Sequence, residues 1–172
     1  MIEMDLVGVR VELPTNTPIL LLREQAPNPR LLPIFIGAPE ATAIALALEG
    51  VEVPRPMTHD LIKVILEHMG LALRRVLVTE LRDKTFFAEL ELGENGDKGE
   101  TRRVSCRPSD AVAVAVRCGA PIFAAEEVLA GAGYREQRDV DDADSGETQD
   151  PDEVVEQFRE FIDTVRPEDF ES

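Results

Sequence analysis

Three short stretches of the sequence gather acidic, basic and hydroxyl side chains where a helix is expected to begin. Residues 37–40 (GAPE) end in an acid. Residues 55–60 (RPMTHD) combine a cation, a hydroxyl, an imidazole and a carboxylate, and residues 107–110 (RPSD) repeat the cation, hydroxyl and acid. The first N–H groups of a helix have no partner within the helix, so an arginine beside them makes a natural phosphate site. These stretches therefore point to chemistry on a phosphate-containing substrate.

The acids in these stretches limit what that chemistry can be. A carboxylate at residue 110 repels a phosphate unless a divalent cation lies between them, so the pattern favours metal-assisted phosphodiester chemistry or a structural Arg–Asp pair. In the first case an imidazole would activate water as a general base, and carboxylates would bind Mg²⁺ or Mn²⁺. The candidate catalytic residues are Glu40, His59, Asp60 and Asp110, and the candidate metal ligands are Glu40, Asp60 and Asp110. The candidate substrate-binding residues are Arg55, Arg107 and Ser109.

Each stretch also has a purely structural interpretation. Glu40 can serve as a first-turn acid that favours the helix dipole, and residues 55–60 can serve as a helix cap with a surface histidine. Two arginine pairs, at 74–75 and 102–103, lie on expected strands, where they either meet across one sheet edge or form solvated rims. These interpretations leave a non-enzymatic alternative open for the whole chain.

Charge is distributed very unevenly along the chain. The 172 residues carry 34 acidic and 18 basic side chains, and this formal net charge of -16 excludes general electrostatic attraction to nucleic acid or anionic lipid. Residues 136–172 hold 15 acids and three bases, whereas residues 1–135 hold 19 acids and 15 bases. The acidity therefore belongs to a C-terminal tail, and the nearly balanced body can still form local basic patches.

The first residues and the cysteines indicate a cytoplasmic protein. Residues 1–5 (MIEMD) are acidic where a signal peptide is basic, and the longest apolar run, at 41–48, is far too short to cross a membrane. Cys106 and Cys118 have no histidine pair nearby, so they give no zinc signature and are expected to be small, partly buried thiols. We therefore expect a cytoplasmic chain without a membrane partner.

The hydrophobic pattern predicts an α+β domain with a mostly antiparallel or mixed sheet and helices packed on it. Apolar residues alternate over 7–13 and run continuously over 19–22 and 31–36, which is typical of three strands in an antiparallel meander. Further strands are expected at 75–81, 85–92, 101–107 and 122–123. Helices are expected at 39–48, at 58–69 with Thr58 as N-cap, at 108–117 and at 125–130. The apolar face expected for the second helix consists of Leu61, Ile62, Ile65, Leu66 and Met69.

Two of the expected helices begin alike. Residues 40–46 (EATAIAL) and 110–116 (DAVAVAV) share the order acid, Ala, any residue, Ala, aliphatic, Ala, aliphatic, and each follows a proline and a strand. This similarity suggests a duplicated strand–helix unit, although Ala-rich helices can also look alike by chance. If an approximate two-fold axis relates the units, Glu40 and Asp110 lie near each other, with His59 or Asp60 close by.

Residues 1 to about 135 resemble the bifunctional nuclease family. The resemblance rests on residues 32–41 (LPIFIGAPEA), 55–61 (RPMTHDL) and 105–111 (SCRPSDA), together with Ala113 and Arg117, whose order and spacing also fit. It implies an α+β domain that self-associates and that cleaves both RNA and DNA. Residues 153–170 also look like the end of the short bacterial members of the family.

We therefore expect a nuclease-like domain at 1–135, an acidic disordered linker at 136–151, and an amphipathic helix and tail at 152–172. The expected function is hydrolysis of phosphodiester bonds in RNA and DNA with a divalent metal. We also expect a homodimer or higher homo-oligomer that forms through the sheet edges or the Ala-rich helices. A non-enzymatic oligomeric scaffold or regulatory module is the alternative, favoured by the net charge and the scarcity of aromatic residues. A third interpretation is a sensor of a small anionic ligand at Arg55 and Arg107.

The helix at 152–165 is expected to dock on the body through Val155, Phe158, Ile162 and Val165. A second role for the tail, as a polyanion that competes with nucleic acid for any basic groove on the body, gives a testable prediction. Deleting residues 136–172 is expected to raise the affinity for an oligonucleotide at low salt, because the tail is a polyanion, and the gain should shrink as salt screens it. Anisotropy titrations of a labelled oligonucleotide at low and high salt measure this. Unchanged affinity would leave the tail as a linker and docking helix. If the shortened body unfolds, charge-neutralising substitutions within 139–150 replace the deletion.

Overall fold

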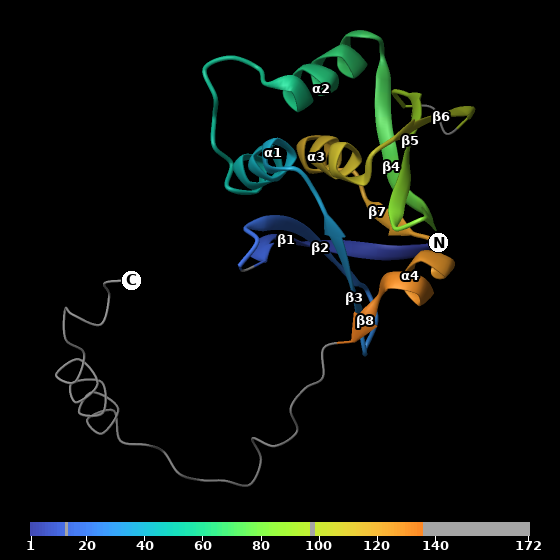
Figure 1. The fold of residues 1–172 in the computed structure, drawn as a ribbon. Helices are drawn as coiled ribbons and strands as arrows, with labels where there is room; N and C mark the ends of the chain where they lie inside the picture. Colours follow the sequence, from blue (N-terminus) through green and yellow to red (C-terminus); the bar gives the residue numbers. More distant parts are fainter. Residues whose placement is uncertain (13, 97–98, 136–172) are drawn as a thin grey trace, which may run out of the picture. The chain divides into compact units, whose positions relative to one another are not determined.

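The computed structural model describes residues 1–12, 14–96 and 99–135 (Figure 1). Its strands are β1 (Ile2–Glu12), β2 (Thr17–Glu24), β3 (Arg30–Phe35), β4 (Leu71–Arg82), β5 (Thr85–Glu94), β6 (Thr101–Cys106), β7 (Ile122–Ala124) and β8 (Tyr134–Arg135). Its helices are α1 (Ala38–Leu48), α2 (Thr58–His68), α3 (Pro108–Cys118) and α4 (Glu126–Ala132). The predicted segments at 136–151 and 152–172 lie outside the described residues.

All described strands join one mixed sheet in the order β6-β5-β4-β7-β1-β2-β3-β8. Strands β1, β2 and β3 form one antiparallel meander, and β4, β5 and β6 form a second. The short β7 joins the meanders, because it pairs parallel to β4 and antiparallel to β1. The predicted α+β class with a mixed sheet is therefore confirmed, and so is the antiparallel meander predicted for the first three strands.

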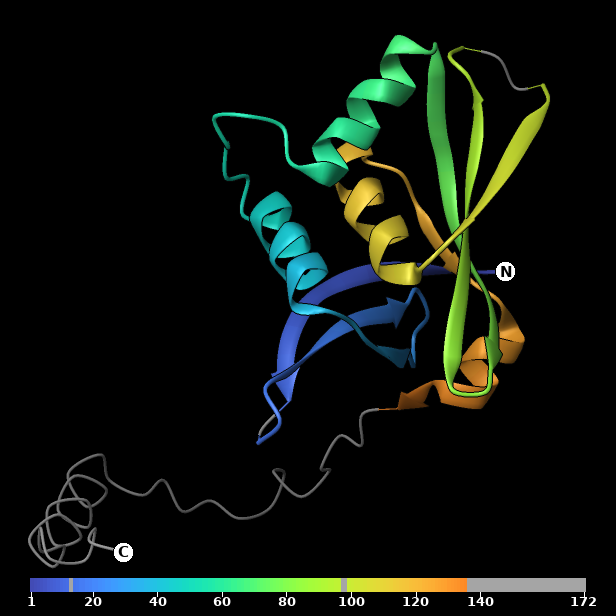
Figure 2. The same ribbon diagram turned by 45° about the horizontal axis from the view of Figure 1, so that its top comes forward.

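One helix follows the last strand of each meander. Helix α1 follows β3 and α3 follows β6, so the two Ala-rich helices occupy matching positions in the topology. They lie side by side in both views (Figures 1 and 2). Small side chains permit this close approach, since Ala111, Ala113 and Ala115 on α3 and Ala41 and Ala43 on α1 are buried. The Ala-rich faces are therefore packed inside the domain.

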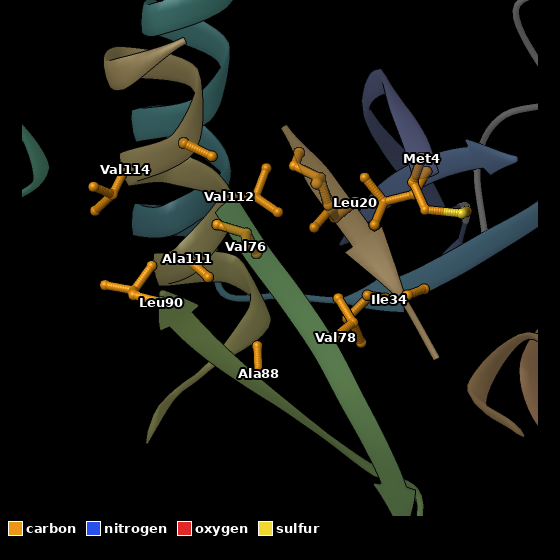
Figure 3. Close-up of a cluster of buried hydrophobic side chains, with 14 of the residues drawn as sticks. Met4, Leu20, Ile34, Val76, Val78, Ala88, Leu90, Ala111, Val112 and Val114 are labelled. Atoms are coloured by element: carbon orange, nitrogen blue, oxygen red, sulfur yellow. The ribbon is translucent and has the colours of Figure 1, made fainter. Parts of the chain in front are cut away.

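A single hydrophobic core connects the two meanders. Met4, Leu20 and Ile34 contribute from β1, β2 and β3, and Val76 and Leu90 contribute from β4 and β5. Val112 and Val114 of α3 belong to the same cluster, whose side chains are drawn in the close-up (Figure 3). Because α3 packs against α1, α2, β4 and β5, it is the central helix of the described structure.

Helix α2 differs from its prediction at its N-terminus and on its apolar face. Met57, not Thr58, is the N-cap, and the Asp60 carboxylate accepts the Met57 backbone N–H at 2.8 Å. Leu66 of the predicted apolar face is buried, whereas Leu61, Ile65 and Met69 are exposed. Within the described part of the chain, the exposed residues therefore form an apolar stripe along α2 and its C-cap, while self-association itself stays a prediction.

Two further observations concern the remaining elements. Strand β8, which pairs with β3, was not predicted, because its two residues give no periodic signal. Among the described residues, none of the helices is long and apolar enough to cross a membrane.

An ion-pair network fastens α4 to the first meander. The Arg30 guanidinium donates to Glu24 of β2 through Nε at 2.8 Å and to Glu126 of α4 through Nη1 at 2.8 Å. The Arg30 hydrogen bond lowers the pKa of Glu24 from 4.5 to about 2, although partial burial opposes the shift. Glu24 is thus ionised when folded at pH values where an unfolded chain would protonate it.

This pKa shift predicts how stability depends on pH. The contribution of Glu24 is complete above its unfolded pKa of 4.5 and is lost as the pH falls through about 2. Glu24→Gln should therefore lower the free energy of unfolding by about 1–3 kcal/mol at neutral pH, and the deficit should shrink as the pH falls.

Urea unfolding across this pH range measures the effect. Glu80→Gln is the matched control, because the Glu80 carboxylate is exposed and 4.0 Å from Arg82, and it should change stability by under about 0.5 kcal/mol. A Glu24→Gln deficit that is the same at neutral and strongly acidic pH would contradict the assignment.

Candidate active site

Helices α1 and α3 each place a carboxylate in the first turn. Each has an extended N-cap residue, Gly37 for α1 and Arg107 for α3, followed by a proline that suits the first turn. Glu40 and Asp110 are both the third helical residue, where an acid is favoured by the helix dipole. Because the two helices are neighbours, the repeated local sequence brings two carboxylates to one region.

Arg107 connects these two carboxylates. Its Nη2 donates to Oε1 of Glu40 at 2.6 Å and to Oδ1 of Asp110 at 3.0 Å, and its Nε donates to Oδ2 of Asp110 at 2.7 Å. The two N–H groups of its Nη1 make no hydrogen bond within the described part of the chain. The Arg107 side chain is 65% exposed, so Nη1 can still serve a ligand.

His59 joins this cluster through Asp110. Its Nε2 lies 3.2 Å from Oδ1 of Asp110, and its side chain is only 10% exposed. If Nε2–H donates to the carboxylate, Nδ1 of the neutral ring is left without a proton and can accept one. Asp110 therefore fixes the imidazole in the tautomer that a general base needs.

Electrostatics keep Asp110 ionised. Partial burial by itself would raise its pKa, but the hydrogen bonds from Arg107 and His59 outweigh burial and hold the pKa below its usual value. The Asp110 and Glu40 hydrogen bonds in turn raise the pKa of Arg107. Burial, followed by the charge of Asp110, raises the pKa of Cys106 to about 11, so this neighbouring thiol is not an ionised nucleophile at neutral pH.

Asp60 belongs to a different pair. Its Oδ1 accepts from Nε of Arg117 at 2.5 Å, and this hydrogen bond lowers the pKa of Asp60 although burial opposes the shift. Arg117 also donates to the Ala43 carbonyl of α1 and the Ala113 carbonyl of its own helix. Sequence reasoning assigned no role to Arg117. The only indication in the sequence was that Arg117 is one of the residues on which the family resemblance rests.

The other predicted residues have separate places. Ser109 is buried at the start of α3, and Arg55 is exposed and makes no ion pair within the described part of the chain. The arginine pairs do not meet, because β5 lies between their strands: Glu91 accepts from Arg75 at 2.8 Å and contacts Arg103 at 3.4 Å. The structure thus brings together Glu40, His59, Arg107 and Asp110, hereafter the Arg107 cluster.

The side chains of the Arg107 cluster are not arranged as a metal centre. Among the described residues, no group of three or more His, Cys, Asp and Glu side chains is arranged to hold a metal ion. Glu40 and Asp110 share one arginine, and Asp60 is bound to another. The residues present therefore do not fit the predicted set of three carboxylate ligands.

A surface pocket adjoins the Arg107 cluster. It has a volume of about 360 Å³ and lies between the end of β3, the turn from β4 to β5 and the start of α3. The residues that give it its chemical character are Phe35, Gly37, Lys84, Phe86, Arg107 and Ser109. Arg107 therefore belongs both to the carboxylate–imidazole cluster and to the wall of this pocket.

The described residues thus form a mixed-sheet α+β domain with an Asp–His–Arg cluster at neighbouring helix starts. The family model for the bifunctional nuclease domain matches residues 20–137. The chain belongs to the bifunctional nuclease domain family.

Named relatives extend this comparison. An uncharacterized protein of Mycobacterium tuberculosis is 46% identical over 170 residues, which cover 99% of this chain and 98% of that protein. Bifunctional nuclease 1 of Oryza sativa subsp. indica is 32% identical over 118 residues, covering 62% of this chain and 36% of that protein. Bifunctional nuclease 2 of Arabidopsis thaliana is 34% identical over 112 residues, covering 64% and 34%. The matches thus span about a third of the plant proteins.

Gly37 controls the position of Glu40. A Cβ atom at Gly37 would collide with Oε2 of Glu40, the mobile end of that side chain, whereas the Gly37 backbone at φ −75° is acceptable for alanine. Gly37→Ala should therefore displace the Glu40 carboxylate from Arg107 and change the free energy of unfolding by less than about 1 kcal/mol.

A crystal structure and a denaturant titration of the variant test this expectation. Gly131→Ala is the matched control, because its Cβ would make an ordinary contact with Leu81 at 3.8 Å and should leave the Glu40–Arg107 pair intact. A Gly37→Ala structure in which Glu40 still binds Arg107 would show that Gly37 does not control this carboxylate.

Proposed function

We propose that this chain is a nuclease that hydrolyses phosphodiester bonds in RNA and DNA. The observation that carries the proposal is the hydrogen bond between His59 and Asp110 beside the half-exposed Arg107, in a member of the bifunctional nuclease domain family. Plant relatives that bear the name bifunctional nuclease support it.

In this proposal the side chains of the cluster have different roles. His59 Nδ1 accepts a proton from the attacking water, the water oxygen bonds to phosphorus, and the proton passes to the leaving oxygen as its bond to phosphorus breaks. Asp110 is a positioning residue that holds the imidazole tautomer. Arg107 offers the two N–H groups of Nη1 to the phosphoryl oxygens.

Glu40 helps to orient the Arg107 side chain and takes no part in the proton transfer. It accepts from Nη2, so it helps to hold the guanidinium at the start of α3. Removing Glu40 would leave Arg107 held by its hydrogen bonds to Asp110 alone.

Dependence on Mg²⁺ or Mn²⁺ remains a proposal separate from these steps. The predicted ligands Glu40, Asp60 and Asp110 are engaged by Arg107 and Arg117, so a metal would have to displace an arginine to bind them. The steps proposed here therefore use the side chains alone, and assays with and without a chelator decide the role of a metal.

His59→Gln should lower the rate of cleavage of labelled single-stranded RNA and DNA by about 10²–10⁴-fold, because the proton acceptor is lost. His68→Gln is the matched control: this histidine is on the same helix, and its Nδ1 lies 2.8 Å from the Val64 carbonyl. Single-turnover assays on both purified variants measure the rates, and thermal unfolding confirms that each is folded.

Equal cleavage by His59→Gln and the wild type would contradict the proposal, because it would assign the activity to a contaminating nuclease. Absence of cleavage by a folded wild-type protein, with and without divalent metal, would favour the non-enzymatic scaffold or regulatory module.

A further inference from the structure

The pocket beside the Arg107 cluster has an unusual charge for this protein. Among the described residues that line it, Lys84 and Arg107 are charged and none is acidic, although Arg107 is itself paired with Glu40 and Asp110. The chain as a whole carries 34 acids and 18 bases, so a pocket lined by two basic residues and by no acid among the described residues is a local exception. Such a pocket suits an anionic ligand.

The pocket also has aromatic walls. Phe35, the last residue of β3, is 58% exposed, and Phe86 of β5 lines the pocket from another strand. The face of an exposed phenylalanine ring can stack on a nucleobase of any sequence. The volume of about 360 Å³ lies in the range of small-ligand sites, which is about 300–1,000 Å³.

The backbone at Lys84 adds an independent observation. Asp83 and Lys84 form the two-residue turn between β4 and β5, where Arg82 pairs with Thr85, and their φ angles are 50° and 63°. Turns of this left-handed kind favour Asn-Gly, so a lysine at the second position is conformationally unfavourable. Strained residues of this kind are concentrated at functional sites.

We propose that this pocket binds one nucleotide of a single-stranded polynucleotide, with the base stacked on Phe35 and the adjoining phosphate held between Lys84 and Arg107. The proposal rests on the proposed nuclease function, because Arg107 would place that phosphate next to His59. A base within a duplex is already stacked and paired, so the pocket selects single strands.

Binding is measured without cleavage, so that its outcome is independent of the catalytic assignment. The full chain carrying His59→Gln is titrated into a fluorescein-labelled 12-nucleotide oligo-dT and, separately, into a labelled duplex of the same length. Unlabelled AMP is then added as a competitor for the bound oligonucleotide. Phe35→Leu, which keeps an apolar side chain but removes the ring, should raise Kd by about 5- to 100-fold, and Phe35→Tyr should restore affinity.

The Lys84→Gly variant separates a binding role of Lys84 from a structural one, because it is expected to lose affinity without losing thermal stability. Glycine accepts the left-handed backbone, so the variant should unfold at a temperature equal to or above that of the parent, while its affinity falls. Its slope of log K against log salt should decrease by about 0.7, the value for one contact to a single-stranded phosphate. Lys63→Ala, which removes an exposed lysine from α2, should leave affinity and slope unchanged.

Wild-type affinity in both Phe35→Leu and Lys84→Gly would overturn the proposal, as would duplex bound as tightly as single strand. AMP bound as tightly as the oligonucleotide would also overturn it, because the site would then hold a mononucleotide. Loss of affinity in these variants with no cleavage by wild-type protein would support the pocket while contradicting the nuclease function.

Discussion

The guanidinium of Arg107 is the point on which this site depends. It joins a carboxylate from the first meander-and-helix unit to a carboxylate from the second, through contacts of 2.6–3.0 Å. Asp110, held in this way, in turn holds His59 from α2. Three helix starts that are far apart in the sequence are thus fixed by one planar cation, whose fork of donors suits two carboxylates at once.

The fold makes this meeting possible by bringing α1 and α3 into contact. Strand β7 joins the two meanders into one sheet, and alanines on the facing helices permit close packing. Arg117 then secures the same three helices from the other end of α3, since it bonds Asp60 of α2 and the Ala43 carbonyl of α1. Its buried side chain makes it a structural counterpart of the exposed Arg107.

Local patterns predicted most of the fold, while side-chain partners depended on long-range pairing. Alternation and continuous apolar runs indicated β1, β2 and β3, and the repeated acid–alanine pattern indicated that Glu40 and Asp110 would be neighbours. The pattern did not reveal that Asp60 binds Arg117, because choosing one arginine among many requires knowing how the helices pack. Likewise, Phe35 and Lys84 give no local signal of sharing a pocket, since a strand end and a distant hairpin turn meet there only in the folded chain.

The most direct test of the central claim, that Asp110 sets the tautomer of His59, is a long-range ¹H–¹⁵N NMR spectrum at a pH where the imidazole is neutral. The structure predicts the tautomer with the proton on Nε2 in the wild type and a mixture of tautomers in Asp110→Asn. His68 serves as an internal reference in the same spectrum. A wild-type His59 with its proton on Nδ1, or a spectrum of His59 that Asp110→Asn leaves unchanged, would contradict the account.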